Sequence, residues 1–208
     1  MERFAILLAG RVRPTPELGA ALRDRRVIAA DGGMAHAVAL DLLPELWVGD
    51  FDSAPNGLPE GLAATPRRTV PRDKDETDGE LAVRTALELG ARDILLVGAL
   101  GGARSDHAFS NLVLALRHAE DGVRIELFDG VERGLPLGPL PLRVEARAGQ
   151  VFSVLLFGRA QGLTIRGARW PLSDADLPFG STLTQSNEAT GPIAAVLARG
   201  RALLLLQA

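Results

Sequence analysis

Short, largely apolar runs alternate with helix-like segments over the first 130 residues of the chain. Such runs predict buried strands, and they lie at residues 4–9, 27–30, 46–48, 94–97 and 124–128. Periodic segments between them predict helices at residues 16–23, 34–40, 77–89 and 106–119. Thr77 and Glu80 form a capping box for the third helix, and Gly90 stands where a helix-ending glycine belongs. This alternation predicts an α/β fold, with a parallel, Rossmann-like sheet and helices on its faces.

The pattern changes after Asp129. Residues 130–141 hold three glycines and three prolines, which is the composition of a linker or turn. Further short runs predict strands at residues 151–157, 163–165, 183–185, 193–197 and 202–206, and the last two flank Arg199-Gly200 as a hairpin. We therefore expect an α/β domain over residues 1–132 and a small all-β domain over residues 133–208. The second domain is small for independent stability, so we expect it to pack on the first domain or on a second subunit.

Composition narrows the function classes. The 208 residues are 47% hydrophobic and 24% charged, which is an ordinary globular balance. The net charge of −3 gives no basic footprint for nucleic acid. The absence of cysteine excludes disulfides, thiolate nucleophiles and cysteine-based zinc sites. No apolar run approaches the roughly 20 residues of a membrane helix, and the apolar start is too short for a signal peptide. We expect a soluble cytoplasmic protein that binds neither nucleic acid nor membrane.

Negative charge is concentrated in one segment. Residues 71–80 hold five acids and two bases, and Lys74 among them is the only lysine of the chain. Concentrated carboxylates repel one another unless they are solvated or bridged by a cation. A solvated helix start would account for Asp78 and Glu80, but a lysine before a helix N-terminus is unfavourable. Carboxylates, a lysine and free helix amides instead favour a nucleoside triphosphate with magnesium.

Three polar segments follow predicted strands, at residues 31–33, 49–53 and 98–102. The carboxyl ends of parallel strands meet at one edge of a sheet, so these segments should open onto one crevice. In an extended turn Asp50 and Asp52 would point the same way and could hold one hard cation. The alternative is an Asx-turn at the strand end.

The glycine-rich turn at residues 98–102 matches neither a Gly-x-Gly-x-x-Gly motif nor a P-loop, and a plain turn is the alternative. Arg104 would suit a phosphate, whereas Ser105 or Asp106 would serve as an ordinary helix cap. His36 and His118 are expected on helix surfaces, and we assign them no role.

Taken together, these residues resemble the thiamine pyrophosphokinase family. The family's ordered motifs correspond to Ala30–Gly33, Gly49–Ser53, Asp73–Asp78, Gly101–Asn111 and Ser186–Glu188, which span most of the chain. Two departures stand out. One extra residue precedes Arg104, and Met34-Ala35-His36 stand where the family often has an asparagine.

The resemblance implies transfer of the terminal pyrophosphoryl group of ATP to the hydroxyethyl oxygen of thiamine, which gives thiamine diphosphate and AMP. It also implies a Mg²⁺ ion that bridges the triphosphate, a C-terminal β-sandwich, and a homodimer with thiamine near the subunit interface. Attack at the β-phosphorus needs no covalent catalysis, since metal and lysine can offset the developing charge.

With this residue chemistry, the resemblance implies a role for each motif. The catalytic residues are Asp50, Asp52, Asp75, Asp78 and Lys74; the four aspartates bind metal, with Asp31 as a further acidic candidate. The ATP-binding residues are Asp31, Gly32, Gly33, Thr77, Gly101, Gly102, Arg104, Asp106 and His107. The thiamine-binding residues are Trp170, Ser186, Asn187 and Glu188. No strongly basic general base stands out, and an aspartate that orients the thiamine hydroxyl would suffice.

Alternatives remain open at this stage. Trp170 offers either an aromatic platform for thiamine or a core residue of the β domain, while Trp47 lies inside a predicted strand and is expected to pack in the core. The chain could be a related pyrophosphokinase for another hydroxyalkyl heterocycle, such as a hydroxymethylpterin. A glycosyltransferase that uses Asp50 and Asp52, or a non-catalytic nucleotide-binding regulator, would leave other motifs unexplained.

Overall fold

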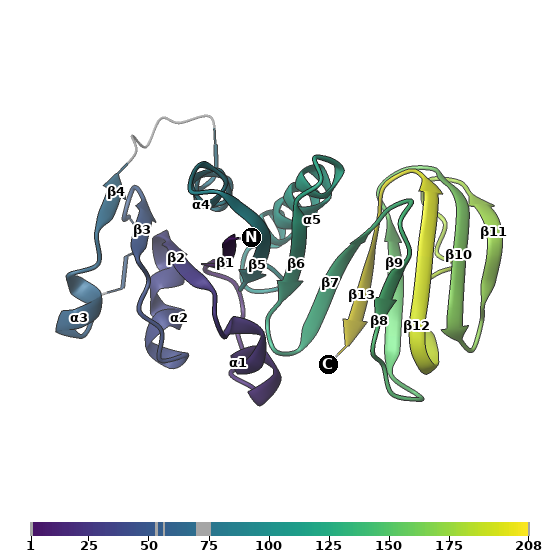
Figure 1. Ribbon diagram of the computed structural model, residues 1–208, viewed down its shortest axis with the longest axis horizontal. Helices are drawn as coiled ribbons and strands as arrows, with labels where there is room; N and C mark the ends of the chain where they lie inside the picture. The colour runs from purple at the N-terminus through teal and green to yellow at the C-terminus, as the bar shows by residue number, and fades with distance from the viewer. Residues whose placement is uncertain (1, 53, 56, 70–75, 208) are drawn as a thin grey trace. The chain divides into compact units, whose positions relative to one another are not determined.

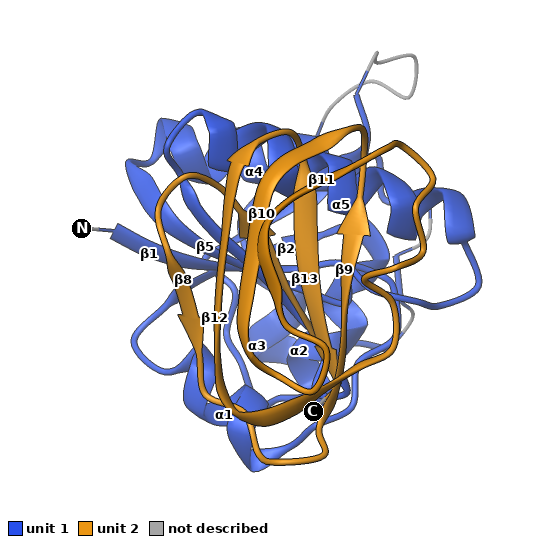
Figure 2. Cartoon of the chain, turned by 90° about the vertical axis from the view of Figure 1, so that its right-hand side faces the viewer, with its two compact units in different colours: residues 1–131 blue, residues 132–208 orange. Residues whose placement is uncertain are grey.

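The computed structural model describes residues 2–52, 54, 55, 57–69 and 76–207. The chain divides into two compact units, unit 1 over Met1–Val131 and unit 2 over Glu132–Ala208 (Figure 2). Unit 1 is an α/β structure, and unit 2 is an antiparallel β structure.

Unit 1 is built on parallel strands. These are β1 (Glu2–Leu7), β2 (Arg26–Ala30), β3 (Leu46–Gly49), β4 (Arg67–Thr69), β5 (Ala91–Val97) and β6 (Arg124–Phe128). Their order is β6-β5-β1-β2-β3-β4, and each neighbouring pair runs parallel. The chain thus builds outward from β1 to β4 and then returns to the other side of β1. The carboxyl ends of β1 and β5 therefore flank the point where the order reverses, which is where open α/β sheets bind ligands.

Helices cover both faces of this sheet. They are α1 (Pro16–Leu22), the 3₁₀ turn η1 (Asp31–Gly33), α2 (Met34–Ala39), α3 (Glu60–Ala63), α4 (Asp78–Glu88) and α5 (Ser105–Glu120). Helices α1, α2 and α3 pack on one face with a core that includes Leu18, Met34 and Leu62, and α4 and α5 lie on the other (Figure 1). None of the described helices is long and apolar enough to cross a membrane.

The predicted alternation in unit 1 is confirmed. Thr77 caps α4 by accepting a hydrogen bond from the Glu80 backbone N–H at 3.2 Å, as the capping box indicated. Three elements were not predicted: the 3₁₀ turn η1, helix α3 and strand β4. The sequence of β4 is Arg-Arg-Thr and has no apolar residue, so periodicity could not reveal it.

Unit 2 contains β7 (Glu132–Leu137), β8 (Leu142–Val144), β9 (Val151–Leu156), β10 (Ala160–Ala168), β11 (Leu172–Leu177), β12 (Asn187–Arg199) and β13 (Ala202–Gln207). One ladder runs β7-β13-β9 and another runs β11-β10-β12-β8, and all these pairs are antiparallel. The first residues of β12, Asn187 and Glu188, also pair with β9 and so join the two ladders. A common core draws on both, with Phe152 and Leu204 from one and Ile165 and Ile193 from the other.

Three predictions for unit 2 are wrong. Part of the expected linker is strand β7, in which Pro136 lies opposite Leu203; the fixed φ of proline is compatible with an extended strand. The expected hairpin around Arg199-Gly200 does not form, because residues 193–197 of β12 pair with β8 and β10, whereas β13 pairs with β7 and β9. Residues 183–185 form a turn, where the Thr184 hydroxyl donates to the Val154 carbonyl at 2.7 Å. Strands β8 and β11 were not predicted.

Candidate active site

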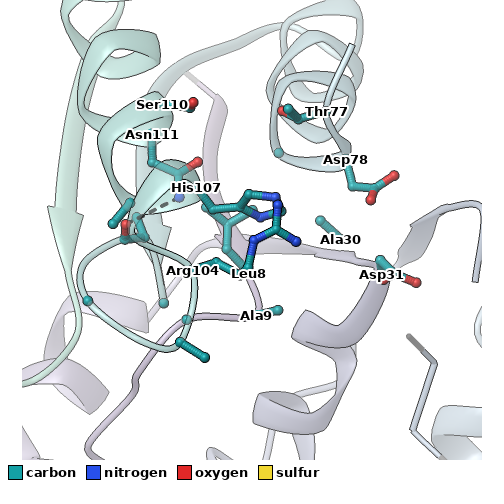
Figure 3. A pocket seen from close by; sticks show the side chains of 17 residues that line it. Leu8, Ala9, Ala30, Asp31, Thr77, Asp78, Arg104, His107, Ser110 and Asn111 are labelled. Atoms are coloured by element: carbon teal, nitrogen blue, oxygen red, sulfur yellow. Dashed lines mark hydrogen bonds between the residues drawn. The ribbon is translucent and has the colours of Figure 1, made fainter. Parts of the chain in front are cut away.

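A cavity of about 220 Å³ opens at the carboxyl ends of the strands of unit 1 (Figure 3). Its walls come from the segment after β1, from η1, from the start of α4, from the turn after β5 and from the first half of α5. The lining residues include Leu8, Ala9, Gly10, Ala30, Asp31, Thr77, Asp78, Gly79, Gly98, Ala99, Gly101, Arg104, His107, Ser110 and Asn111. The prediction that segments after several strands share one crevice is confirmed for residues 31, 98, 99 and 101, whereas none of the described residues of 49–53 is among the lining residues.

Glycines allow two of these segments to run in close contact. The Gly10 N–H donates to the Gly98 carbonyl at 2.9 Å, and a Cβ on Gly10 would lie 2.3 Å from that same oxygen. A Cβ on Gly98, where φ is +72°, would lie 2.3 Å from the Leu8 carbonyl oxygen. Any larger residue at either position would push the two loops apart. The glycines therefore set the floor of the cavity.

The start of α4 meets α5 at the same cavity. A Cβ on Gly79 would lie 3.3 Å from Asn111 Oδ1, so α4 and α5 pack closely here. The Nδ2 group of Asn111 donates to the Ala99 carbonyl at 3.2 Å and ties the turn after β5 to α5. Glu80 of α4 also accepts an ion-pair contact from Arg117 of α5 at 2.7 Å.

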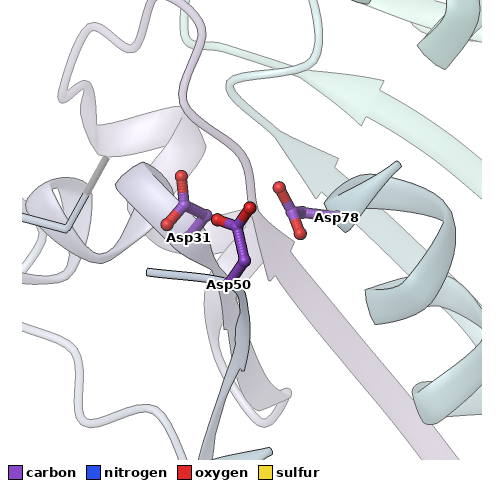
Figure 4. A group of neighbouring side chains, drawn as sticks. All are labelled: Asp31, Asp50 and Asp78. Atoms are coloured by element: carbon purple, nitrogen blue, oxygen red, sulfur yellow. The ribbon is translucent and has the colours of Figure 1, made fainter. Parts of the chain in front are cut away.

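Three carboxylates come together at one side of the cavity. Asp31 of η1, Asp50 after β3 and Asp78 at the start of α4 each offer an oxygen within 4.8 Å of the other two (Figure 4). Carboxylates this close repel one another, and a shared divalent cation would relieve that repulsion. Their hard oxygen donors fit the coordination preference of Mg²⁺. Asp31 is buried, whereas Asp50 and Asp78 are half-buried.

Asp52 is placed differently from Asp50. The turn is not extended as expected, because Phe51 between them has a φ of +64°. Asp50 Oδ1 accepts a hydrogen bond from the Asp52 backbone N–H at 3.1 Å, so the Asx-turn alternative is present as well. Among the described residues, the acids close enough to share a cation are Asp31, Asp50 and Asp78, and Asp52 is exposed beside them. Lys74 and Asp75 lie outside the described residues.

The predicted ATP-binding residues near α5 are exposed. Arg104 makes a bidentate ion pair with Asp106, with N–O distances of 2.9 and 2.7 Å. This guanidinium holds the pKa of the Asp106 carboxyl well below its usual range. Arg104 and His107 both line the cavity. Gly101 and Gly102 both have positive φ values, as a tight turn after β5 requires.

Several residues of the cavity were not assigned a role from the sequence. Leu8 and Gly10 follow the first strand, and that position alone could have indicated them. His36 was assigned no role from the sequence. Its Nε2 lies 2.8 Å from the Gly10 carbonyl oxygen. Because a carbonyl oxygen can only accept, the Nε2–H of His36 donates this hydrogen bond. Asn111 ends the motif Gly101–Asn111 that resembles the family, but nothing in the sequence indicated a role for Ser110.

The predicted thiamine-binding residues lie together within unit 2. Trp170 is 52% exposed, which contradicts the core alternative. Arg169 stacks on its ring, with 4.8 Å from the guanidinium carbon to the ring centroid, and pairs with Glu188 at 2.9 Å. Asn187 is buried, and its side chain bonds the Trp170 backbone. Ser186 precedes it with a φ of +55°. Asn187 thus holds the Trp170 backbone. Glu188 pairs with the Arg169 guanidinium that lies over the Trp170 ring.

Two family models and one curated relative match the chain. The model of the thiamin pyrophosphokinase catalytic domain matches residues 21–127, and that of the thiamin pyrophosphokinase vitamin B1 binding domain matches residues 140–196. Thiamine pyrophosphokinase of Bacillus subtilis (strain 168) is 26% identical over 193 residues, which are 90% of each chain.

Solved structures show the same fold. The crystal structure of thiamine pyrophosphokinase from Bacillus subtilis has a TM-score of 0.84 and 24% identity, covering 99% of both chains. That of thiamin pyrophosphokinase from Geobacillus thermodenitrificans has a TM-score of 0.79 and 26% identity, covering 100% of this chain and 98% of the other. The catalytic-domain model alone matches more than half of the 208 residues. The chain therefore belongs to the thiamin pyrophosphokinase family.

Proposed function

We propose that the cavity of unit 1 binds ATP with Mg²⁺ and that the chain transfers the terminal pyrophosphoryl group of ATP to the hydroxyethyl oxygen of thiamine. The observation that carries this proposal is the group formed by Asp31, Asp50 and Asp78 at the edge of a glycine-lined cavity. In this reading residues 1–132 hold ATP and metal, and residues 133–208 hold thiamine. The match to a vitamin B1 binding domain favours thiamine over a hydroxymethylpterin.

Asp31, Asp50 and Asp78 would hold the metal, and we keep Asp52 and Asp75 as further candidates. Bound Mg²⁺ would offset the negative charge of the triphosphate. The partial positive charge at the N-terminus of α4 favours an anion beside Thr77 and Asp78. Lys74, Arg104 and His107 supply further positive or hydrogen-bonding groups for phosphate.

The reaction needs one bond to form and one to break. The thiamine hydroxyl oxygen forms a bond to the β-phosphorus of ATP, and the bond from that phosphorus to the α/β bridging oxygen breaks, so that AMP leaves. One carboxylate of the acidic group orients the hydroxyl and accepts its proton. The role of the chain is then positioning and charge stabilisation, as in other phosphoryl transfers.

The flat rings of thiamine would stack on the exposed face of Trp170. The guanidinium of Arg169 already covers part of the Trp170 ring. Thiamine would therefore stack on the part of the ring that Arg169 leaves exposed. We propose that a homodimer completes the thiamine site, because half of this indole is open to solvent within one chain. Light scattering and activity at the same protein concentration test this. A fully active monomer would contradict the shared site.

A direct assay tests the proposed reaction. The protein is incubated with ATP, Mg²⁺ and thiamine, and chromatography measures AMP and thiamine diphosphate. Equal amounts of both products are expected, with none when thiamine is omitted. A hydroxymethylpterin in place of thiamine tests the related pyrophosphokinase. Production of AMP with the pterin and not with thiamine would reject thiamine as substrate, and no AMP with either would favour a non-catalytic regulator.

A further inference from the structure

Trp47 contacts both turns that carry buried or half-buried acids of the cavity. It lies in β3, opposite Ala29 of β2 and Arg67 of β4, and it is 1% exposed. The expectation that it packs in the core is confirmed. Beside this packing, Trp47 makes two specific contacts with the turns that carry Asp31 and Asp50.

The first contact fixes Asp31. The indole Nε1–H of Trp47 donates to the Asp31 backbone carbonyl at 2.9 Å, in a buried position. Asp31 has a φ of +40°, a left-handed conformation that non-glycine residues rarely adopt. Such backbone persists only where its surroundings hold it. The buried hydrogen bond from Trp47 supplies one such restraint.

The second contact fixes the turn that carries Asp50. The rings of Trp47 and Phe51 meet edge to face, with centroids 5.0 Å apart and planes at 86°. Phe51 also has a left-handed backbone, with a φ of +64°, and it directly follows Asp50. The Arg67 guanidinium covers both rings, at 4.6 Å from the Trp47 centroid and 5.2 Å from that of Phe51.

These contacts fix the turn that carries Asp31 relative to the turn that carries Asp50. A Cβ on Gly49 would lie 3.1 Å from the Asp31 Cβ, so the turns are packed against each other with little room. A small displacement of either backbone would change the separation of the Asp31 and Asp50 carboxylates. Metal ligands depend on such outer contacts for their orientation.

We propose that Trp47 is a positioning residue, which holds Asp31 and Asp50 at the separation needed to share a divalent cation. The inference rests on the metal site of the proposed function. The indole N–H of Trp47 is the group that this role requires, because it bonds the Asp31 carbonyl. A phenylalanine would fill much of the same space without that bond.

Mn²⁺ binding, measured by electron paramagnetic resonance without nucleotide, tests this role directly. Trp47→Phe keeps an aromatic ring and removes the N–H, and we expect the Kd for Mn²⁺ to rise about tenfold, the lower end of the range for lost outer-shell partners. Phe51→Leu removes the edge-to-face contact at a half-buried position and should weaken Mn²⁺ binding in the same direction. It also keeps the inference testable if Trp47→Phe folds poorly.

Leu22→Ala is the matched control. Leu22 belongs to the same core as Trp47 and is also buried, so its truncation lowers the Tm and should leave the Kd for Mn²⁺ unchanged. Wild-type Kd values in both Trp47→Phe and Phe51→Leu would overturn the role of Trp47 and leave the metal site standing. An equal loss of Mn²⁺ binding in Leu22→Ala would show that the effect comes from general destabilisation, and it would also overturn the role of Trp47. If the wild-type protein binds no Mn²⁺, the metal site and this role are both wrong.

Discussion

The side chain of Asn187 bonds the backbone of Trp170 at both its polar groups: Oδ1 accepts from the Trp170 N–H at 3.2 Å, and Nδ2 donates to the Trp170 carbonyl at 2.8 Å. Oδ1 also accepts from the Glu188 N–H at 2.9 Å. Asn187 was predicted from the sequence to bind thiamine. Its described bonds instead indicate that it acts through Trp170.

Asn187→Ala should therefore raise the KM for thiamine roughly tenfold, since leaving buried partners unsatisfied costs about 1–3 kcal/mol. The KM for ATP should stay near its wild-type value. Steady-state kinetics with each substrate varied in turn measure the split. Thr164→Val is the control, because it also removes a side-chain bond to backbone in unit 2, to Asp174 N–H at 3.0 Å. An equal rise of both KM values would contradict the positioning role.

Trp170→Ala should raise the KM for thiamine far more than that for ATP. The exposed ring contributes little to the core, so the Tm should fall by much less than the loss of roughly 3–5 kcal/mol for a buried tryptophan would cause. Differential scanning calorimetry and kinetics on the same preparation check both. A large fall in Tm with an unchanged KM for thiamine would reject Trp170 as the platform.

Asp50→Asn should abolish turnover while the fold stays intact. Loss of a direct ligand should cost more than the roughly 100-fold that loss of an outer-shell partner causes. Asp52 was also assigned to the metal from the sequence, but it is exposed beside the group, so Asp52→Asn should cost less. Comparing kcat for the two variants at saturating Mg²⁺ separates their roles. Near-normal kcat for Asp50→Asn would show that the metal assignment is wrong.

Lys74→Arg should reduce kcat on the order of 100-fold, the scale of one lost electrostatic contact to the reacting group. It keeps the charge but replaces a compact ammonium by a planar fork. A surface lysine would tolerate the change, since arginine supplies every other basic residue of the chain. Arg92→Lys, an exchange at an exposed position of β5, is the control. Unchanged kcat in Lys74→Arg would remove Lys74 from the site.

Gly98→Ala should destabilise the protein more than Gly122→Ala does. Both glycines have positive φ, at +72° and +81°, so each alanine costs about 1–2 kcal/mol in backbone strain. Only the Cβ at 98 meets a backbone oxygen, at 2.3 Å, whereas that at 122 meets nothing within 4 Å. The difference in Tm between the two variants measures the cost of the steric clash between the Cβ at position 98 and the Leu8 carbonyl oxygen. Gly98→Ala should also weaken ATP binding, and equal Tm values would show that the loops adapt freely.

Local signals were enough for most of unit 1. The helix start at Thr77 and the buried run of β5 depend on neighbours in sequence, so patterns revealed them. The turn between Asp50 and Asp52 is not extended as expected, because Phe51 has a left-handed backbone and its ring packs on Trp47 of the sheet. The glycine signal at Arg199-Gly200 marked a real turn, with Gly200 at φ +119°. It did not indicate that the strands on either side of this turn would pair with different partners, residues 193–197 of β12 with β8 and β10, and β13 with β7 and β9.

The two tryptophans have opposite surroundings, and the chain has no tyrosine. Trp47 is buried in unit 1, and Trp170 is half exposed in unit 2. Their fluorescence should therefore differ in emission wavelength and in access to a soluble quencher such as iodide. Each unit then carries its own optical reporter. Denaturation followed at the blue and red sides of the emission band would reveal whether the two units lose their structure together or in succession.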